Sequence, residues 1–147
     1  SDSIYRSGTP TLALAAAADT ALTLAIEYRD ERTSVVRDMR TQLETALSAF
    51  PKVRINSPVG GVPHILNLSV QGVKGTQFQK ALSEWGVCVS VKSACSSDGL
   101  PSKAVFAVSR ERKNALSSWR ISLSWRTTQE DITGFLQAFD ACYQELA

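Results

Sequence analysis

The sequence predicts an α+β (α/β) fold with a small, mostly antiparallel sheet and helices on one side. Near both ends of the chain, apolar residues recur every three or four positions, which is the period of helices that bury one face. Between these regions lie short stretches in which apolar and polar residues alternate, the period of half-buried strands. Because short strands and helices are mixed along the chain, we expect two packed layers around one core.

Size and composition limit the possible functions. A chain of 147 residues with 44% hydrophobic residues is expected to form one domain. The net charge is +2 and the charges are scattered, so the composition favours no nucleic acid and no membrane as a partner. No apolar run has membrane-spanning length, and no signal peptide opens the chain. Three cysteines without disulfide spacing favour a reducing compartment, so we expect a cytoplasmic protein.

The first fifty residues predict one long helix or two helices in series. Thr9 and Pro10 are typical of a helix start, and an Ala/Leu-rich stretch follows to about residue 28. Pro51 ends the helical region. One apolar face is formed by residues at spacings of three and four, namely Val36, Met39, Leu43, Leu47 and Phe50.

The middle of the chain predicts three strands and one helix. Residues 53–55 and 64–70 are interpreted as strands. A helix capped by Thr76 is expected to run to about residue 85, with Gly86 just beyond its end, where a left-handed residue is common. Residues 87–91 alternate valine with cysteine and serine, which predicts a third strand.

The last third predicts a short helix over 101–108, a solvated charge cluster at 110–113, a strand and a final helix. In the strand, Trp119, Ile121 and Leu123 alternate with polar residues. Two overlapping capping boxes, one from Thr127 and one from Thr128, indicate where the final helix begins.

Cys95 lies at the centre of a small, polar loop over residues 93–99. Such a loop suits a nucleophilic thiolate, although an unremarkable loop cysteine has the same sequence pattern. Lys92 would favour the thiolate if the two side chains converged. Cys88 and Cys142 lie within a predicted strand and a predicted helix, so we expect both in the core.

Three other positions are candidate site residues. Arg120 projects opposite the apolar side of its strand, either as a surface arginine or as a guanidinium fork for a carboxylate. Thr9 lies at a helix N-terminus, which is either an anion site or an ordinary cap. His64 is the single histidine, and a structural role is favoured over a Cys–His dyad. No metal site is expected, because close Cys or His pairs are absent.

Four blocks, taken in order, resemble the C-terminal third of the pyridoxal-phosphate-dependent cysteine desulfurases of the class V aminotransferase family. They are residues 6–9 (Arg-Ser-Gly-Thr), 62–69 (Val-Pro-His-Ile-Leu-Asn-Leu-Ser), 93–97 (Ser-Ala-Cys-Ser-Ser) and 120–132, which opens Arg-Ile-Ser-Leu-Ser. The resemblance covers essentially the whole chain. It implies the small C-terminal domain of the aminotransferase-like (fold type I) architecture. We therefore expect the end of a missing large domain at 1–9, an interdomain helix or helix pair at 10–50, and the small domain at 51–147.

The resemblance also implies roles for three residues. Cys95 would take sulfur from L-cysteine as a persulfide, leaving L-alanine, and Arg120 would bind the substrate α-carboxylate. Thr9 would contact the cofactor phosphate of the neighbouring subunit in a homodimer. The sulfur would pass to an acceptor protein, such as an iron-sulfur scaffold or a tRNA thiolation enzyme.

The sequence departs from the family pattern at two points. Val91 and Lys92 stand where serine and glycine are common, and the stretch between Cys95 and Pro101 is about one residue shorter. The chain does not begin with methionine, so we expect a fragment. No lysine in it has the context of a Schiff-base lysine, so the fragment alone should bind no pyridoxal phosphate and be inactive. The alternatives are a stand-alone sulfur-relay or interaction module, a related class V aminotransferase, and a selenocysteine lyase.

Overall fold

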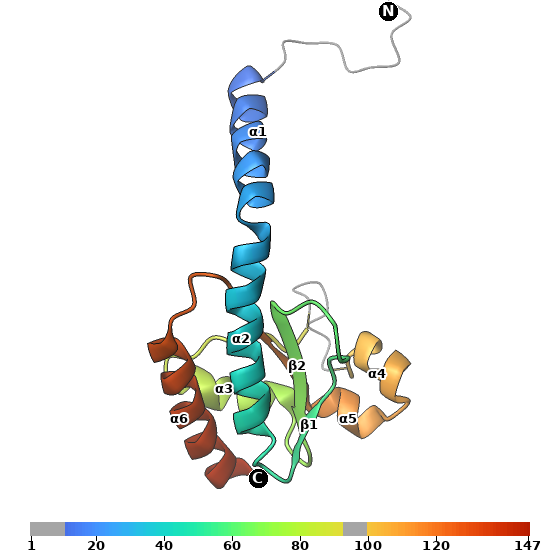
Figure 1. Ribbon diagram of the computed structural model, residues 1–147. Helices are drawn as coiled ribbons and strands as arrows, with labels where there is room; N and C mark the ends of the chain where they lie inside the picture. The colour runs from blue at the N-terminus through green and yellow to red at the C-terminus, as the bar shows by residue number, and fades with distance from the viewer. Residues whose placement is uncertain (1–10, 93–99) are drawn as a thin grey trace, which may run out of the picture.

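A three-stranded antiparallel sheet with helices packed on it forms the body of the molecule, and a helix projects from this body (Figure 1). The computed structural model describes residues 11–92 and 100–147. The predicted α+β class and antiparallel sheet are confirmed. The elements are α1 (Leu12–Glu27), α2 (Arg29–Leu47), β1 (Val53–Ile55), β2 (Ile65–Val70), α3 (Gly75–Glu84), α4 (Lys103–Ser109), α5 (Arg112–Ser117), β3 (Ser118–Ser122) and α6 (Gln129–Leu146).

Residues 12–47 form two helices in series rather than one. The backbone leaves the helical region at Tyr28 (φ −98°, ψ 9°), between α1 and α2. α1 buries none of its residues and extends away from the sheet (Figure 1), whereas α2 packs on it through Val36, Leu43 and Leu47. None of the described helices is long and apolar enough to cross a membrane.

The sheet has the order β1-β2-β3, and its register determines which side chains share a face. Leu68 pairs with Trp119 and Leu66 pairs with Ile121. Because successive side chains of a strand alternate, these four residues all point to one face, which α2, α3 and α6 cover. The Phe78 ring of α3 stacks on Trp119 at a centroid distance of 5.3 Å. The core therefore lies on one face of the sheet and leaves the polar residues on the other.

A buried arginine joins α2 to the start of β2. Arg40 is 7% exposed, and its Nη1 donates to the carbonyl oxygens of Val62 (2.7 Å) and Ile65 (3.1 Å). Its Nε donates to Glu44 one turn further along α2. This contact fixes the residues that lead into β2, the strand at the centre of the sheet.

The short helices α4 and α5 occupy the polar side of the sheet, which corrects the expectation that the helices lie on one side only. α5 contacts β2 there, and Ser69 Oγ donates to the carbonyl oxygen of Asn114 at 3.0 Å. The predicted charge cluster at 110–113 is not a loop throughout. Arg110 is left-handed (φ 58°) and ends α4, and Arg112 begins α5, a helix that the sequence did not predict. α3 begins at Gly75 with Lys74 as its N-cap, two residues before the predicted cap Thr76.

The strand predicted over 87–91 is wrong except at one residue. Only Ser90 pairs, as an isolated antiparallel bridge to Arg120. The backbone before it is engaged elsewhere, because the Val87 N–H donates to Leu82 and the Val89 carbonyl accepts from the Gln79 side chain. Val87, Val89 and Val91 pack against the core, and Cys88 alternates with them and is exposed. This corrects the expectation that Cys88 lies in the core, whereas Cys142 is buried as predicted.

Candidate functional site

Four polar side chains form one row on the face of the sheet opposite the core. The antiparallel register places Asn67 of β2 opposite Arg120 of β3. Beyond β3, Ser90 exchanges two backbone hydrogen bonds with Arg120, at 3.1 and 2.7 Å. Beyond β2, the Asn56 N–H donates to the Asn67 carbonyl at 2.8 Å. The row therefore runs Asn56, Asn67, Arg120, Ser90, from segments far apart in the sequence.

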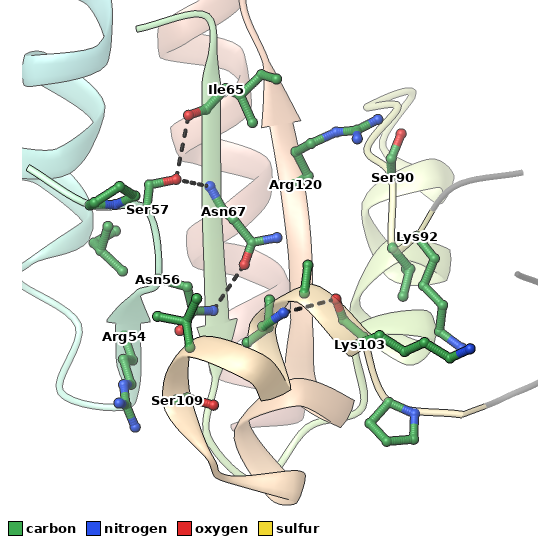
Figure 2. A pocket seen from close by; sticks show the side chains of 18 of the residues that line it. Arg54, Asn56, Ser57, Ile65, Asn67, Ser90, Lys92, Lys103, Ser109 and Arg120 are labelled. Atoms are coloured by element: carbon green, nitrogen blue, oxygen red, sulfur yellow. Dashed lines mark hydrogen bonds between the residues drawn. The ribbon is translucent and has the colours of Figure 1, made fainter. Parts of the chain in front are cut away.

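A pocket of about 770 Å³ lies over this row, between the polar face of the sheet and the start of α4 (Figure 2). Four of its described lining residues carry a positive charge, namely Arg54, Lys92, Lys103 and Arg120. No aspartate or glutamate is among the described residues of the lining. The excess of positive charge favours an anionic ligand.

The guanidinium of Arg120 makes no hydrogen bond or ion pair with any described residue. Its backbone is fixed by Ser90, and its side chain is only partly exposed. Its Nε is buried and has no hydrogen-bond partner among the described residues. Such an unsatisfied donor costs about 1–3 kcal/mol, which a bound carboxylate would offset. The planar fork of an arginine can bind both oxygens of a carboxylate at once.

Arg54 is engaged elsewhere. Its Nη1 donates to both carboxylate oxygens of Glu111, at 2.7 and 2.8 Å. This ion pair joins β1 to the junction of α4 and α5 and balances the charge of Arg54 locally. Arg120 is therefore the better placed of the two arginines to bind an anion.

A network of amides lies beside Arg120. Asn56 Nδ2 donates to Asn67 Oδ1 (2.9 Å) and to Ser69 Oγ (2.8 Å). Asn114 Nδ2 donates in turn to Asn56 Oδ1 at 2.9 Å. Figure 2 shows the Asn67 amide held on its Asn56 side, with its nitrogen turned toward β3. The sequence analysis missed Asn56 and Asn67, although the alternation in β2 places Asn67 on the polar face.

The predicted site residues have different outcomes. The structure places Arg120 in the pocket, on the face that the strand alternation predicted. Cys95 and Thr9 lie outside the described residues, but Lys92 and Leu100, the described residues on either side of 93–99, both line the pocket. His64 is not a lining residue, and its carbonyl accepts from the Leu123 N–H within the fold.

The described lining does not fit pyridoxal phosphate. That cofactor needs a Schiff-base lysine and a partner for its ring nitrogen. The described part of the lining holds no acidic residue and no aromatic ring that could stack on the cofactor. These residues suit a small carboxylate instead. Among the described residues, no group of three His, Cys, Asp or Glu side chains could hold a metal ion.

The comparisons with known proteins agree on one family. The family model described as "Aminotransferase class-V" matches residues 1–135. A cysteine desulfurase of Sinorhizobium fredii is 30% identical over 126 residues, which are 84% of this chain and 33% of that protein. A NifS/IcsS protein homolog of Lactobacillus delbrueckii subsp. bulgaricus is 28% identical over 97% of this chain and 38% of its own length. The chain thus spans about a third of the length of these relatives.

The solved structures agree on the fold. A NifS-like protein superposes with a TM-score of 0.81 at 25% identity, over 96% of this chain and 36% of the other. The similarity covers α1 as well as the sheet and its helices, because nearly all of the chain is included.

Proposed function

Because the chain belongs to the class-V aminotransferase family, we propose that it is the small C-terminal domain of a cysteine desulfurase. In the complete protein its pocket binds the α-carboxylate of L-cysteine, and the enzyme removes the sulfur, leaving L-alanine. The observation that carries this proposal is Arg120, a guanidinium unpaired among the described residues, in a pocket whose described lining has no acidic residue.

Cys95 is the proposed sulfur acceptor. It lies three residues after Lys92 and five before Leu100, and both of these residues line the pocket that contains Arg120. Because three residues of chain span at most about 11 Å, Cys95 is tethered close to the pocket. This short tether supports a thiolate that takes sulfur from a substrate whose carboxylate Arg120 holds.

In this proposal, the groups that hold the cofactor belong to residues outside the described lining of the pocket. Pyridoxal phosphate, the cofactor of the proposed complete enzyme, would supply the electron sink for breaking the C–S bond. We propose that residues 1–9 end a large domain that holds it, that residues 10–50 connect the two domains, and that Thr9 contacts the cofactor phosphate of a second subunit. The same proposal includes a homodimer in the cytoplasm, with sulfur passed to an iron-sulfur scaffold or a tRNA thiolation enzyme.

Mass spectrometry of the complete protein after exposure to L-cysteine tests this function. We expect one added sulfur on Cys95 and release of L-alanine. Cys95→Ala should abolish both, whereas Cys88→Ala, which removes an exposed thiol outside the pocket lining, should change neither. Turnover that survives Cys95→Ala would contradict the proposal and favour an aminotransferase or a selenocysteine lyase. The 147-residue chain alone should show no absorbance from a Schiff base with pyridoxal phosphate and no turnover.

A further inference from the structure

We propose that Asn67 is a second substrate-binding residue, whose side-chain amide donates a hydrogen bond to the carboxylate that Arg120 holds. The proposal rests on the function proposed above for Arg120, and extends it to a residue that recognises the same group. It is carried by three features of the structure: the pairing of the two residues, the direction of the Asn67 amide and the chemistry of the pocket.

The two residues face each other without sharing a backbone hydrogen bond. The Asn67 N–H and carbonyl are engaged on the β1 side, by Ser57 Oγ and by the Asn56 N–H, each at 2.8 Å. The Arg120 N–H and carbonyl are engaged on the opposite side, by Ser90. In an antiparallel pair of this kind the Cα atoms are about 4.5 Å apart, so the two side chains start from adjacent positions on the polar face.

The amide network fixes which end of the Asn67 side chain is available. Ser69 Oγ gives its proton to the Asn114 carbonyl, so it must accept from Asn56 Nδ2. The Asn56 amide group that faces Asn67 is therefore the Nδ2 donor, and Asn67 accepts from it with Oδ1. The NH2 group of Asn67 then points away from Asn56 and makes no hydrogen bond to any described residue (Figure 2).

A carboxylate can use the donors of both residues. Its two oxygens offer about four acceptor positions, and an arginine fork occupies two of them. An amide N–H beside the fork can fill a third. The chain of amides from Asn114 through Asn56 to Asn67 polarises that donor, because hydrogen bonds in series strengthen one another. The proposed ligand class is a small α-amino acid, bound through its carboxylate by Arg120 and Asn67 together.

The test uses the 147-residue chain and L-alanine, with the side-chain amide of Asn67 followed by NMR. In the wild type, L-alanine should shift the Asn67 amide signal, whereas L-alaninamide, which has no carboxylate, should not. Asn67→Ala should weaken L-alanine binding about tenfold, the loss expected for one hydrogen bond to a charged group. Asn67→Asp should weaken it about a hundredfold, because the new carboxylate competes for Arg120.

Gln71→Ala is the matched control, because it removes an exposed amide just after β2, outside the pocket lining. It should bind L-alanine like the wild type. Wild-type protein whose Asn67 amide does not shift at any L-alanine concentration would overturn the inference without needing a variant. Binding lost in Arg120→Ala but kept in Asn67→Ala overturns the inference and leaves the proposed function standing. Binding kept in Arg120→Ala overturns both.

Discussion

Asn67 and Arg120 lie opposite each other at the centre of β2 and β3, one residue from the core pair Leu68 and Trp119. The buried pair and the polar pair are consequences of the same register. A slip of one residue would turn Arg120 into the core and Trp119 into the pocket, at a large cost in buried apolar surface. The packing of the core therefore determines where the carboxylate-binding group lies.

Replacing Arg120 with lysine should show whether substrate binding needs only the positive charge or also the planar shape of the guanidinium. Lysine keeps the positive charge but loses the planar fork. In the complete protein, Arg120→Lys should raise KM for L-cysteine by about tenfold or more, with a smaller effect on kcat, because the lost contact is made in the ground state as well. Steady-state kinetics with L-cysteine measure both constants.

Arg126→Lys is the control for this substitution. Arg126 is exposed, lies shortly after β3 outside the pocket lining and packs against Trp125 with a ring distance of 5.0 Å. Its replacement should leave KM unchanged. An unchanged KM in Arg120→Lys as well would mean that Arg120 does not bind the substrate.

The sequence predicts the polar face of the sheet but not its pairing. Alternation alone places Arg120 opposite Trp119 and Ile121, because a strand has a period of two residues. Nothing local in the sequence indicates that Asn67 pairs with Arg120. That contact depends on the register of two strands far apart in the chain, which only the packed core determines. For this reason Arg120 was found from sequence and the amide network was not.

The predictions for residues 87–91 and 110–113 are wrong for local reasons that the apolar period of the sequence does not show. Residues 87–91 alternate like a strand, but the Gln79 side chain binds the Val89 carbonyl and limits pairing to Ser90. Cys88 is exposed because it alternates with Val87 and Val89, which pack against the core. Residues 110–113 look like a solvated loop because they are charged, yet Arg112 begins a six-residue helix that is too short to show an apolar period.

Gly75 should be required at the contact between α3 and β3. A Cβ atom at this position would overlap the backbone oxygen of Ser118, two residues before Arg120. Backbone atoms cannot move aside as a flexible side chain can, so Gly75→Ala should destabilise the fold by about 1–3 kcal/mol. Urea unfolding of the 147-residue chain measures the loss.

Gly134→Ala tests the opposite case. Gly134 is in α6, and a Cβ there would meet no atom within 4 Å. Alanine should stabilise the helix by about 0.5–1 kcal/mol, because glycine loses more conformational freedom on folding. If both alanine variants shifted the stability in the same direction, the steric explanation for Gly75 would be wrong.

Thr128 should stabilise the start of α6. Its side chain accepts from the Asp131 N–H at 3.1 Å, and the Asp131 carboxylate accepts from the Thr128 N–H at 2.8 Å. Thr128→Ala breaks this capping box and should cost about 1 kcal/mol in thermal or urea unfolding. Thr133→Ala, an exposed substitution within the same helix, should cost nothing. Equal losses in the two variants would argue against the cap.

Cys142 should make stability depend on pH in the alkaline range. Burial raises the pKa of this thiol, and the negative charges of Glu145 and Glu84 raise it further. A thiol with a higher pKa in the folded state stabilises the fold fully below its unfolded pKa, about 8.5. This contribution is lost as the pH rises toward the folded pKa, since the unfolded chain then releases its proton more readily.

The free energy of unfolding of the wild type should therefore fall more steeply above about pH 8.5 than that of Cys142→Ala. Comparing slopes rather than absolute stabilities removes the effect of the lost side-chain volume. Because Cys142 of α6 belongs to the hydrophobic core, parallel slopes for the wild type and Cys142→Ala would mean that this thiol is not desolvated in solution.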